Sequence, residues 1–349
     1  MNILQMLRMQ SRLIPDIVDK FNKRYELLLS IQIHQPIGRK SLIDIMSMTE
    51  RQLRTECEIL TKLGLINKNT TGMTITEDGQ KFLADFKNYI VVDNFKLETE
   101  KIKNYFGLKK VLVVKGDFTK SDVTKKNMVN LLFDNINDIL SKGSVIGVSG
   151  GSTMQYVASN VDKTFGYGKD IIISPIRGAL TISNTGYQSN DIATQLAVNS
   201  NHKYQLLHAP DNIESSTLDE LIKEPIVKQS LDIIAKTSVI IHSVGDAFEM
   251  AQRRKLPVDV ISLLKENFAV SEAFGSYFDA DGNVIYSTKT IGMSSSDVKN
   301  VANIFTIAGG CDKSEAIYSY LNSKPSNTTL IIDESICKKI LNKLNKNIS

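Results

Sequence analysis

The segment VIGVSGGSTMQYVA, Val145–Ala158, carries the clearest fold signal in the chain. It begins as an apolar, β-branched run typical of a strand, breaks at Gly150-Gly151, and resumes as a helix from Met154. Glycines let a ligand approach the backbone, and the free N–H groups and dipole of a helix N-terminus favour an anion. The segment therefore predicts either an anion site, with hydroxyls from Ser152 and Thr153, or an ordinary capped turn. It matches neither GxGxxG nor a Walker loop, so neither a dinucleotide nor ATP is implied.

Composition bounds the class of protein. The 349 residues are enough for about two domains, and 42% hydrophobic with 23% charged residues is typical of a globular protein. We find no apolar run long enough to cross a bilayer, and arginines interrupt the apolar positions of the first residues, so we expect a cytoplasmic protein. The three cysteines and four histidines are scattered, which predicts no metal site. A net charge of +4 neither proves nor excludes binding to nucleic acid.

Strands alternate with helices beyond Lys109. This alternation predicts an α/β domain with a doubly wound, Rossmann-like parallel sheet, in which ligands bind beyond the carboxyl ends of the strands. The helix is expected over Asp122–Leu140. The expected strands lie at residues 110–116, 145–150, 171–176, 203–210, 238–245 and 304–307.

Polar residues follow several of these strands. Arg177 follows a buried strand and can bind a phosphate bidentately, while Gln188 and Asn190 can donate to hydroxyls. One arginine of Arg253-Arg254 can close on an anion, next to Asp246, and Glu272 is suited to accept hydrogen bonds from sugar hydroxyls.

A second strand, Gly-Gly, helix unit follows residues 304–307, with Lys313 at the helix start. Two glycine turns together with these cations predict two anionic groups on one ligand. Each feature also has an ordinary structural explanation, but their common position at strand ends favours a phosphosugar pocket.

The first 94 residues have the pattern of helices around a short hairpin. A core helix over Arg12–Ser30 is followed by a short helix, RKSLIDIM, and by a longer helix from Glu50 to Gly64 with Thr49 as its N-cap. The inward stripe of the longer helix is expected to be Leu53, Cys57, Leu60 and Leu63. Two strands about a turn at Asn69–Gly72 and a helix through Phe82 and Phe86 complete the order of a winged helix.

This order predicts a winged helix-turn-helix that binds DNA, because a recognition helix presents its N-terminal side chains to the major groove. A helical oligomerisation or protein-binding module is the alternative. Glutamates among the arginines weaken bulk attraction to DNA, so useful affinity would need a dimer or tetramer. The candidate DNA-binding residues are Arg39, Lys40, Thr49, Arg51, Gln52, Arg54 and Lys68.

Motifs along nearly the whole chain resemble the SorC family of bacterial transcriptional regulators. They are IPDIVDKFNKRYELLLSI, QPIGRKSL, NKNTTGMTITEDG, VSGGSTMQYVA, VGDAFEMAQRR, AVSEAFGSYFDADG and AGGCDKSEAI. The resemblance implies a winged-helix DNA-binding domain over residues 1–94 and, over residues 95–349, an effector and oligomerisation domain similar in fold to ribose-5-phosphate isomerase and glucosamine-6-phosphate deaminase. It implies effector contacts from Gly150, Gly151, Ser152, Thr153, Arg177, Gln188, Arg253, Glu272 and Lys313.

The chain is most similar to members that repress a glycolytic operon and respond to fructose-1,6-bisphosphate. We therefore expect a repressor with operator DNA and a phosphorylated sugar as partners, acting as a homodimer or homotetramer without a cofactor or catalytic residue. The rival is a sugar-phosphate isomerase or deaminase with Glu272 or Asp246 as general base. Against it, the scattered histidines offer no acid partner, and an isomerase has no need of a winged helix. A purely structural module would leave the basic residues without a role.

Overall fold

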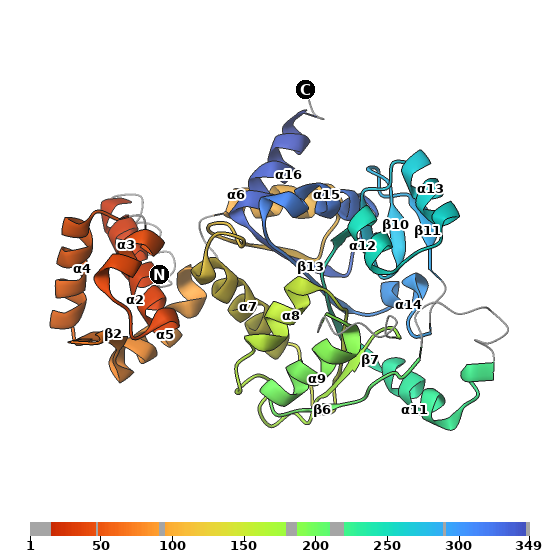
Figure 1. Ribbon diagram of the computed structural model, residues 1–349, viewed down its shortest axis with the longest axis horizontal. Helices are drawn as coiled ribbons and strands as arrows, with labels where there is room; N and C mark the ends of the chain where they lie inside the picture. The colour runs from red at the N-terminus through yellow and green to blue at the C-terminus, as the bar shows by residue number, and fades with distance from the viewer. Residues whose placement is uncertain are drawn as a thin grey trace, which may run out of the picture. The chain divides into compact units, whose positions relative to one another are not determined.

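The computed structural model describes residues 15–46, 48–90, 95–178, 187–209, 220–288 and 291–346, with the side chains of residues 15–19 and 85–90 not described. The chain divides into two compact units. The first is Met1–Asn94 with Lys120–Val123, and the second is Phe95–Thr119 with Thr124–Ser349 (Figure 1).

The first unit has the predicted order of elements. Two helices pack against a third, and a two-stranded antiparallel hairpin and a last helix follow (Figure 1). The elements are α2 (Pro15–His34), α3 (Arg39–Met46), α4 (Glu50–Lys62), β1 (Ile66–Asn69), β2 (Gly72–Ile75) and α5 (Glu77–Ile90). Asn69 pairs with Gly72, which confirms the predicted turn of the wing. The start of the first predicted helix, at Arg12, lies outside the described residues.

The core of the first unit is apolar, and each of the helices described here, α2 to α5, contributes to it. Leu27 and Leu28 of α2, Leu42 of α3 and Leu53 of α4 are almost completely buried. Leu53, Cys57 and Leu60 form the predicted stripe, but the prediction for Leu63 is wrong, since that residue is 59% exposed. The helix ends at Lys62, and Leu63 is its C-cap before Gly64 (φ +72°), so the 3.6-residue period no longer points the side chain inward.

The second unit is built on a seven-stranded parallel sheet. Its strand order is β3-β13-β12-β7-β4-β5-β6. The strands are β3 (Lys110–Val114), β4 (Val145–Val148), β5 (Ile172–Pro175), β6 (Lys203–Tyr204), β7 (Thr237–His242), β12 (Asn303–Ala308) and β13 (Thr328–Asp333). From the middle of the sheet, β4, β5 and β6 follow one another towards one edge, while β7, β12 and β13 follow one another towards the opposite edge. The sheet is therefore doubly wound, as predicted, with its switch point between β4 and β7.

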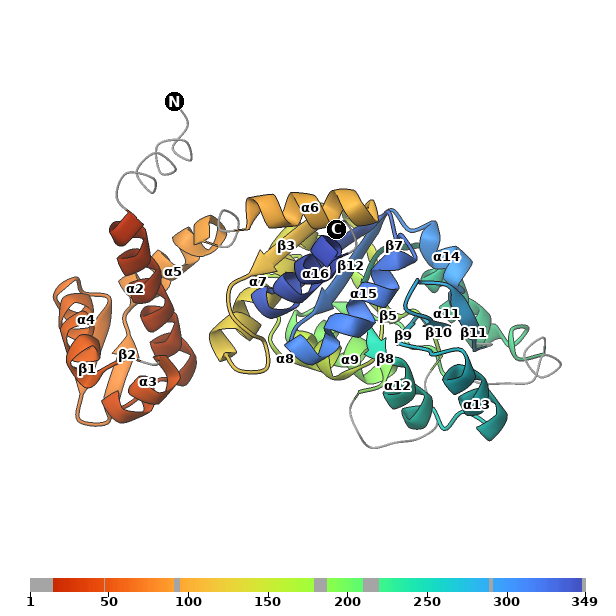
Figure 2. The ribbon, with the colours of Figure 1, turned by 90° about the horizontal axis from the view of Figure 1, so that it is seen from above.

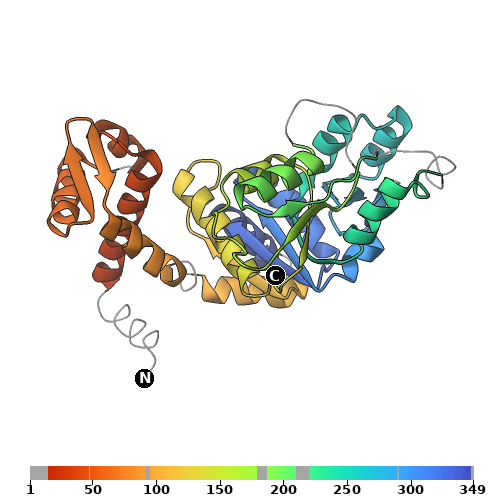
Figure 3. The same cartoon turned by 90° about the horizontal axis from the view of Figure 1, so that it is seen from below.

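Helices cover both faces of this sheet. Figure 2 shows α6 (Lys96–Phe106), α15 (Ser314–Asn322) and α16 (Glu334–Lys346) over one face. Figure 3, from the opposite side, shows α7 (Asp122–Asn137), α8 (Ser152–Ser159) and α9 (Ser189–Asn199) over the other. The parallel strands other than the exposed edge strand β6 are consequently buried on both sides, which explains their nearly continuous apolar sequences. None of the helices in the described part of the chain is both long and apolar enough to cross a membrane.

A small antiparallel sheet at one side of the second unit is not predicted from the sequence. Its order is β11-β10-β9-β8, and α12 (Ala247–Arg253) and α13 (Val258–Glu266) pack near it (Figure 1). The strands are β8 (Gly245–Asp246), β9 (Ser271–Ala273), β10 (Ser276–Phe278) and β11 (Val284–Ser287). Runs of two to four residues are too short to show a period. The remaining short elements are α11 (Pro225–Ile234), α14 (Ser295–Lys299) and the 3₁₀ turn η1 (Cys311–Lys313).

Candidate functional site

A cavity opens at the carboxyl ends of β4, β5 and β7, next to the switch point of the large sheet. Its volume of about 190 Å³ is far above the roughly 10–15 Å³ that one water needs, so it has room for a larger ligand. We call it the strand-end cavity. The effector contacts that the family resemblance implies all line it, namely Gly150, Gly151, Ser152, Thr153, Arg177, Gln188, Arg253, Glu272 and Lys313.

Asn190, in contrast, is not among the lining residues. Its side-chain amide donates to the Leu207 carbonyl at 3.1 Å, and its oxygen accepts the Leu207 N–H at 3.3 Å. The prediction that Asn190 serves hydroxyl groups of a ligand is therefore wrong: its side chain positions the segment after β6.

The first glycine turn, Gly150-Gly151, joins β4 to α8 at the wall of the cavity. Its strand, turn, helix order confirms the prediction, although the helix begins at Ser152, two residues earlier than expected. Gly151 adopts φ +116°, and a Cβ on Gly150 would lie 2.6 Å from the Tyr187 carbonyl oxygen, so both positions require glycine. Gly151 is also the N-cap and makes no side-chain cap hydrogen bond. The start of α8 is thus of the kind that binds anions.

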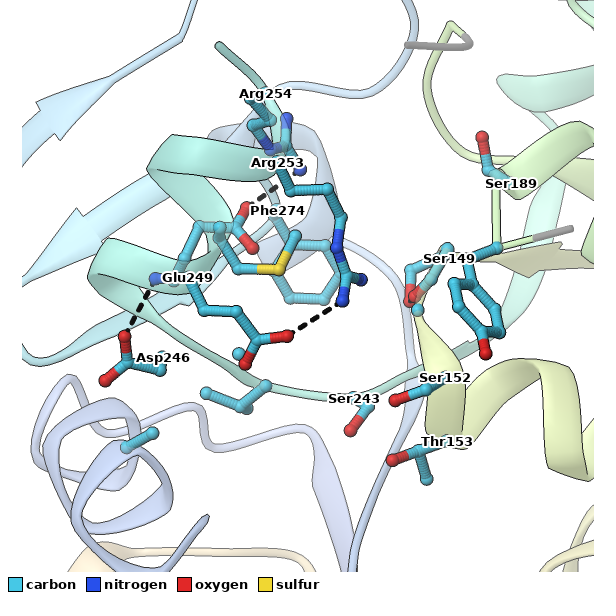
Figure 4. Close-up of a pocket in the computed structure, with 18 of the residues that line it drawn as sticks. Ser149, Ser152, Thr153, Ser189, Ser243, Asp246, Glu249, Arg253, Arg254 and Phe274 are labelled. Atoms are coloured by element: carbon cyan, nitrogen blue, oxygen red, sulfur yellow. Dashed lines mark hydrogen bonds and ion pairs between the residues drawn. The ribbon is translucent and has the colours of Figure 1, made fainter. Parts of the chain in front are cut away.

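Lys313 brings a positive charge to this helix start. Its Nζ donates to Thr153 Oγ1 at 2.7 Å, although the two residues are 160 positions apart in the chain. Burial lowers the pKa of Lys313, and the nearby carboxylates of Asp312 and Glu249 oppose that effect. The ammonium and the threonine hydroxyl therefore face the cavity together at the N-terminus of α8 (Thr153 labelled in Figure 4).

The second glycine turn, Gly309-Gly310, packs against neighbouring loops, whereas the first lies at the wall of the cavity. The Gly310 N–H donates to Asp333 Oδ2 at 2.6 Å, and the Phe118 N–H donates to the same oxygen at 2.8 Å. A Cβ on Gly309 would lie 2.3 Å from the Phe118 side chain. These glycines serve close packing between loops and do not line the cavity, which corrects the prediction that both glycine turns face the ligand. The turn supplies the cavity with Lys313 instead.

Arg177 is 6% exposed and lies at the side of the cavity next to the small sheet. Its Nη2 donates to Thr288 Oγ1 at 2.7 Å. The guanidinium lies directly over Gly275, where a Cβ would be 1.9 Å from Nη1. Gly275 (φ +75°) therefore leaves the space in which Arg177 lies.

The residue pattern left open which arginine of Arg253-Arg254 meets an anion, and the family resemblance implied Arg253, but Arg254 also lines the cavity (Figure 4). Its Nη2 lies 3.1 Å from Glu272 Oε1, with side chains only 12% and 6% exposed. The same Glu272 oxygen accepts the Gly275 N–H at 2.6 Å. Glu272 thus joins α12 to the small sheet through one carboxylate oxygen, in addition to facing the cavity. No local sequence pattern shows which of Arg253 and Arg254 pairs with Glu272. The tertiary structure decides this, because β9 places Glu272 next to Arg254.

Arg253 projects from the last turn of α12 (Figure 4). Its Nη2 lies 2.8 Å from Glu249 Oε1, and its guanidinium lies 5.7 Å from the centre of the Tyr187 ring. Both partners are more exposed than those of the Arg254 pair, at 31% for Arg253 and 64% for Glu249. This arginine can therefore exchange partners more readily.

The candidate general bases both have other roles. Asp246 is the N-cap of α12, and its Oδ1 accepts the Phe248 and Glu249 N–H groups, each at 2.9 Å. Glu272 is paired with Arg254. His242 is completely buried and is not among the lining residues; its Nε2 lies 2.6 Å from Thr306 Oγ1, and burial lowers its pKa to about 3. Within the described ranges, no group of three or more histidine, cysteine or acidic residues could hold a metal ion.

The candidate DNA-binding side chains lie on the exposed surface of the first unit. Thr49 and Gln52 form a reciprocal capping box at the start of α4, with N to O distances of 3.3 and 3.1 Å. Arg54 pairs with Glu58 at 3.0 Å, while Arg51 is exposed in the first turn of α4. Every residue of the predicted set is exposed: Arg39, Lys40, Thr49, Arg51, Gln52, Arg54 and Lys68. Thr49 and Gln52 thus stabilise the helix whatever else they contact.

Two family models together match nearly all of the chain beyond residue 20. One, described as "CggR N-terminal DNA binding domain", matches residues 21–90, and the other, "Putative sugar-binding domain", matches residues 90–342.

Full-length relatives and a solved structure agree with these matches. The chain is 34% identical over 338 residues to the central glycolytic genes regulator of Bacillus subtilis (strain 168), covering 97% of this chain and 98% of the relative. It is 33% identical over 342 residues to the regulator of the same name from Priestia megaterium, covering 97% and 99%. The crystal structure titled "putative SorC family transcriptional regulator" from Enterococcus faecalis superposes with a TM-score of 0.66 at 31% identity, covering 70% of this chain and 99% of that one. The chain therefore belongs to the SorC family of sugar-binding transcriptional regulators, and it joins a DNA-binding domain to a sugar-binding domain.

Proposed function

We propose that this protein represses glycolytic genes and that a phosphorylated sugar, fructose-1,6-bisphosphate, controls its affinity for the operator. The names of the two full-length relatives support the choice of target genes. The observation that carries the choice of a phosphorylated effector is the contact between Lys313 and Thr153 at the open N-terminus of α8.

In this proposal one phosphate binds at the start of α8. The first amides of the helix, the hydroxyls of Ser152 and Thr153, and the Lys313 ammonium would be its donors. A second anionic group would bind near Arg253 or Arg177 in the same strand-end cavity. Gln188 and Glu272 would then contact sugar hydroxyls, with the second Glu272 oxygen available in addition to the one that Arg254 and Gly275 contact.

The first unit would bind operator DNA through α4, the start of α3 and the wing. Arg51 and Arg54 would reach the major groove, with Arg39, Lys40 and Lys68 on the phosphates. A homodimer or homotetramer would supply the affinity that the mixed charge of this unit lacks. The effector changes operator affinity only if it binds more tightly to one arrangement of the subunits than to another.

Fluorescence anisotropy on a labelled operator fragment from a glycolytic operon tests the proposal. Operator affinity should fall when fructose-1,6-bisphosphate is added and should not change with fructose. A thermal-shift screen of glycolytic phosphosugars identifies the effector, because a ligand that binds only the folded protein raises the melting temperature. An operator complex that no phosphorylated sugar alters would contradict the proposal.

An isomerase or deaminase activity is the weaker candidate. The two possible bases are engaged, Asp246 as a helix cap and Glu272 in a buried ion pair. Incubating the protein with fructose-6-phosphate or ribose-5-phosphate and analysing the products tests it directly.

A further inference from the structure

Glu249 lines the strand-end cavity and contacts Arg253, one of the candidate effector-binding cations. It lies on α12, one helical turn before Arg253, and Figure 4 shows its carboxylate pointing to the Arg253 guanidinium. The Nη2 to Oε1 distance is 2.8 Å. The protein itself therefore supplies an anion to Arg253.

This ion pair is easily exchanged. Glu249 is 64% exposed, and ion pairs with such exposure contribute little, because water solvates both charges and the side chains lose freedom. The buried pair of Arg254 and Glu272, with exposures of 12% and 6%, is the opposite case, since breaking it would leave a buried charge. Of the two adjacent arginines, Arg253 is thus the one that a ligand can take over.

The charge of Glu249 also acts on Lys313, another residue that lines the cavity. Its carboxylate is one of the two that oppose the lowering of the Lys313 pKa by burial. A single acidic side chain therefore interacts with two of the candidate cations for the anionic groups of the effector, Arg253 and Lys313.

We propose that Glu249 is an internal competitor, which occupies Arg253 in the free protein and is displaced by an anionic group of the effector. This inference rests on the proposed function, in which the strand-end cavity binds a phosphorylated sugar. A phosphate carries nearly two negative charges and several acceptor oxygens, so it can displace a carboxylate that holds the arginine through a single exposed ion pair. An uncharged sugar cannot do so. Glu249 consequently sets the affinity threshold that an anionic group of the effector must overcome to reach Arg253.

Isothermal titration of Glu249→Gln with fructose-1,6-bisphosphate tests this role. Glutamine keeps the length of the side chain but removes the charge that competes for Arg253. We expect the dissociation constant to fall by a factor of roughly two to five, the range that the strength of an exposed ion pair implies. Fructose without phosphate should bind the variant no better than it binds the original protein.

Two controls separate this role from others. Glu315→Gln removes the same charge from the cavity lining, but Glu315 pairs with Lys343 rather than with Arg253, so it should change affinity less. In the background of Arg253→Ala, adding Glu249→Gln should give little further gain in affinity, because the cation for which the two anions compete is gone. Circular dichroism and the melting temperature confirm that each variant is folded.

Weaker or unchanged binding by Glu249→Gln would overturn the inference, the weaker result indicating that Glu249 accepts a hydrogen bond from the ligand. An equal gain from Glu315→Gln would also overturn it, in favour of bulk charge. If the original protein binds no phosphorylated sugar, the proposed function fails and this inference fails with it. Binding by the original protein without the expected gain rejects only the role of Glu249.

Discussion

Lys313 shows how one side chain can connect two strand ends. Its Nζ lies 2.7 Å from Thr153 Oγ1, so the turn after β12 and the start of α8 form one wall of the cavity. Replacing it by alanine removes the only charge that this wall directs at the start of α8 among the described contacts.

We expect Lys313→Ala to weaken binding of fructose-1,6-bisphosphate about tenfold or more, because a hydrogen bond to a charged group is worth roughly 1.5–3 kcal/mol. Thermal shift with increasing ligand measures this loss. Operator affinity without ligand should not change, and Lys338→Ala, on the exposed side of α16, serves as control. A full ligand response in Lys313→Ala would mean that the phosphate binds elsewhere.

Gly275 is the residue that gives Arg177 its place. A Cβ at this position would be 1.9 Å from Arg177 Nη1, so Gly275→Ala should displace the guanidinium and weaken ligand binding about tenfold. The positive φ of Gly275 adds roughly 1–2 kcal/mol of backbone strain for alanine.

Gly168→Ala is the matched control for that strain. Gly168 has φ +76°, nearly the value of Gly275, but no atom of the described residues lies within 4 Å of the position that a Cβ would take, so only stability should fall. Chemical denaturation and isothermal titration separate the two effects. Equal ligand affinity in both variants would show that Arg177 has no part in binding.

His242 should make the second unit sensitive to acid. Burial lowers its folded pKa to about 3, whereas an unfolded histidine titrates near 6.5. Below the unfolded pKa, protons bind the unfolded chain preferentially, so this contribution is fully present above about pH 6.5 and is lost as the pH falls towards the folded pKa. The limiting slope for one group is about 1.4 kcal/mol per pH unit.

His242→Gln should flatten the decline in stability between about pH 6.5 and 4.5 relative to the original protein. Denaturant unfolding at several pH values measures the difference. Parallel stability curves for the two proteins would show that His242 does not cause the acid sensitivity.

At the scale of the element, α4 allows helix stability and the proposed DNA contact to be tested separately. Thr49 and Gln52 hold the N-terminus of the helix through the capping box, while Arg51 is exposed in the same turn.

Thr49→Ala should lower the stability of the first unit by about 0.5–2 kcal/mol through the lost cap. Arg51→Ala should leave the melting temperature unchanged but weaken operator binding, and a phosphate contact would also reduce the salt dependence by about one ion. Thermal unfolding and anisotropy at several salt concentrations distinguish the two variants. An unchanged operator affinity for Arg51→Ala would place the DNA-binding surface elsewhere.

At the scale of the whole molecule, the proposed regulation couples two binding events. If fructose-1,6-bisphosphate weakens operator binding by some factor, operator DNA must weaken sugar binding by the same factor, because the coupling is a difference of equilibrium free energies. Typical couplings are about 1–3 kcal/mol, or roughly 5- to 150-fold.

Titrating the effector into the free protein and into the operator complex measures this reciprocity. Glu249→Gln should shift both effector affinities in parallel, since its proposed role lies within the cavity. Unequal factors for the two ligands would show that a further equilibrium, such as subunit dissociation, takes part in the response.

Local patterns determined much of this protein. The winged-helix order follows from helical periods, a cap at Thr49 and a turn at Asn69–Gly72, and the doubly wound sheet follows from buried strands that alternate with helices. Residues such as Thr153 and Arg177 could be predicted to line one cavity, because the carboxyl ends of parallel strands meet at one edge of the sheet. Each of these patterns spans only a few consecutive residues, so it can be recognised in the sequence without knowing which distant residues pack together.

The tertiary structure decided what depends on neighbours far along the chain. Gly310 donates to Asp333 rather than facing the cavity, Arg254 forms the buried pair with Glu272, and Asn190 bonds to Leu207. The small sheet likewise forms from strands of two to four residues, which have no stable pattern of their own. Hydrogen bonds and ion pairs take the partner that packing brings within about 3 Å, and a linear sequence does not specify which partner that is.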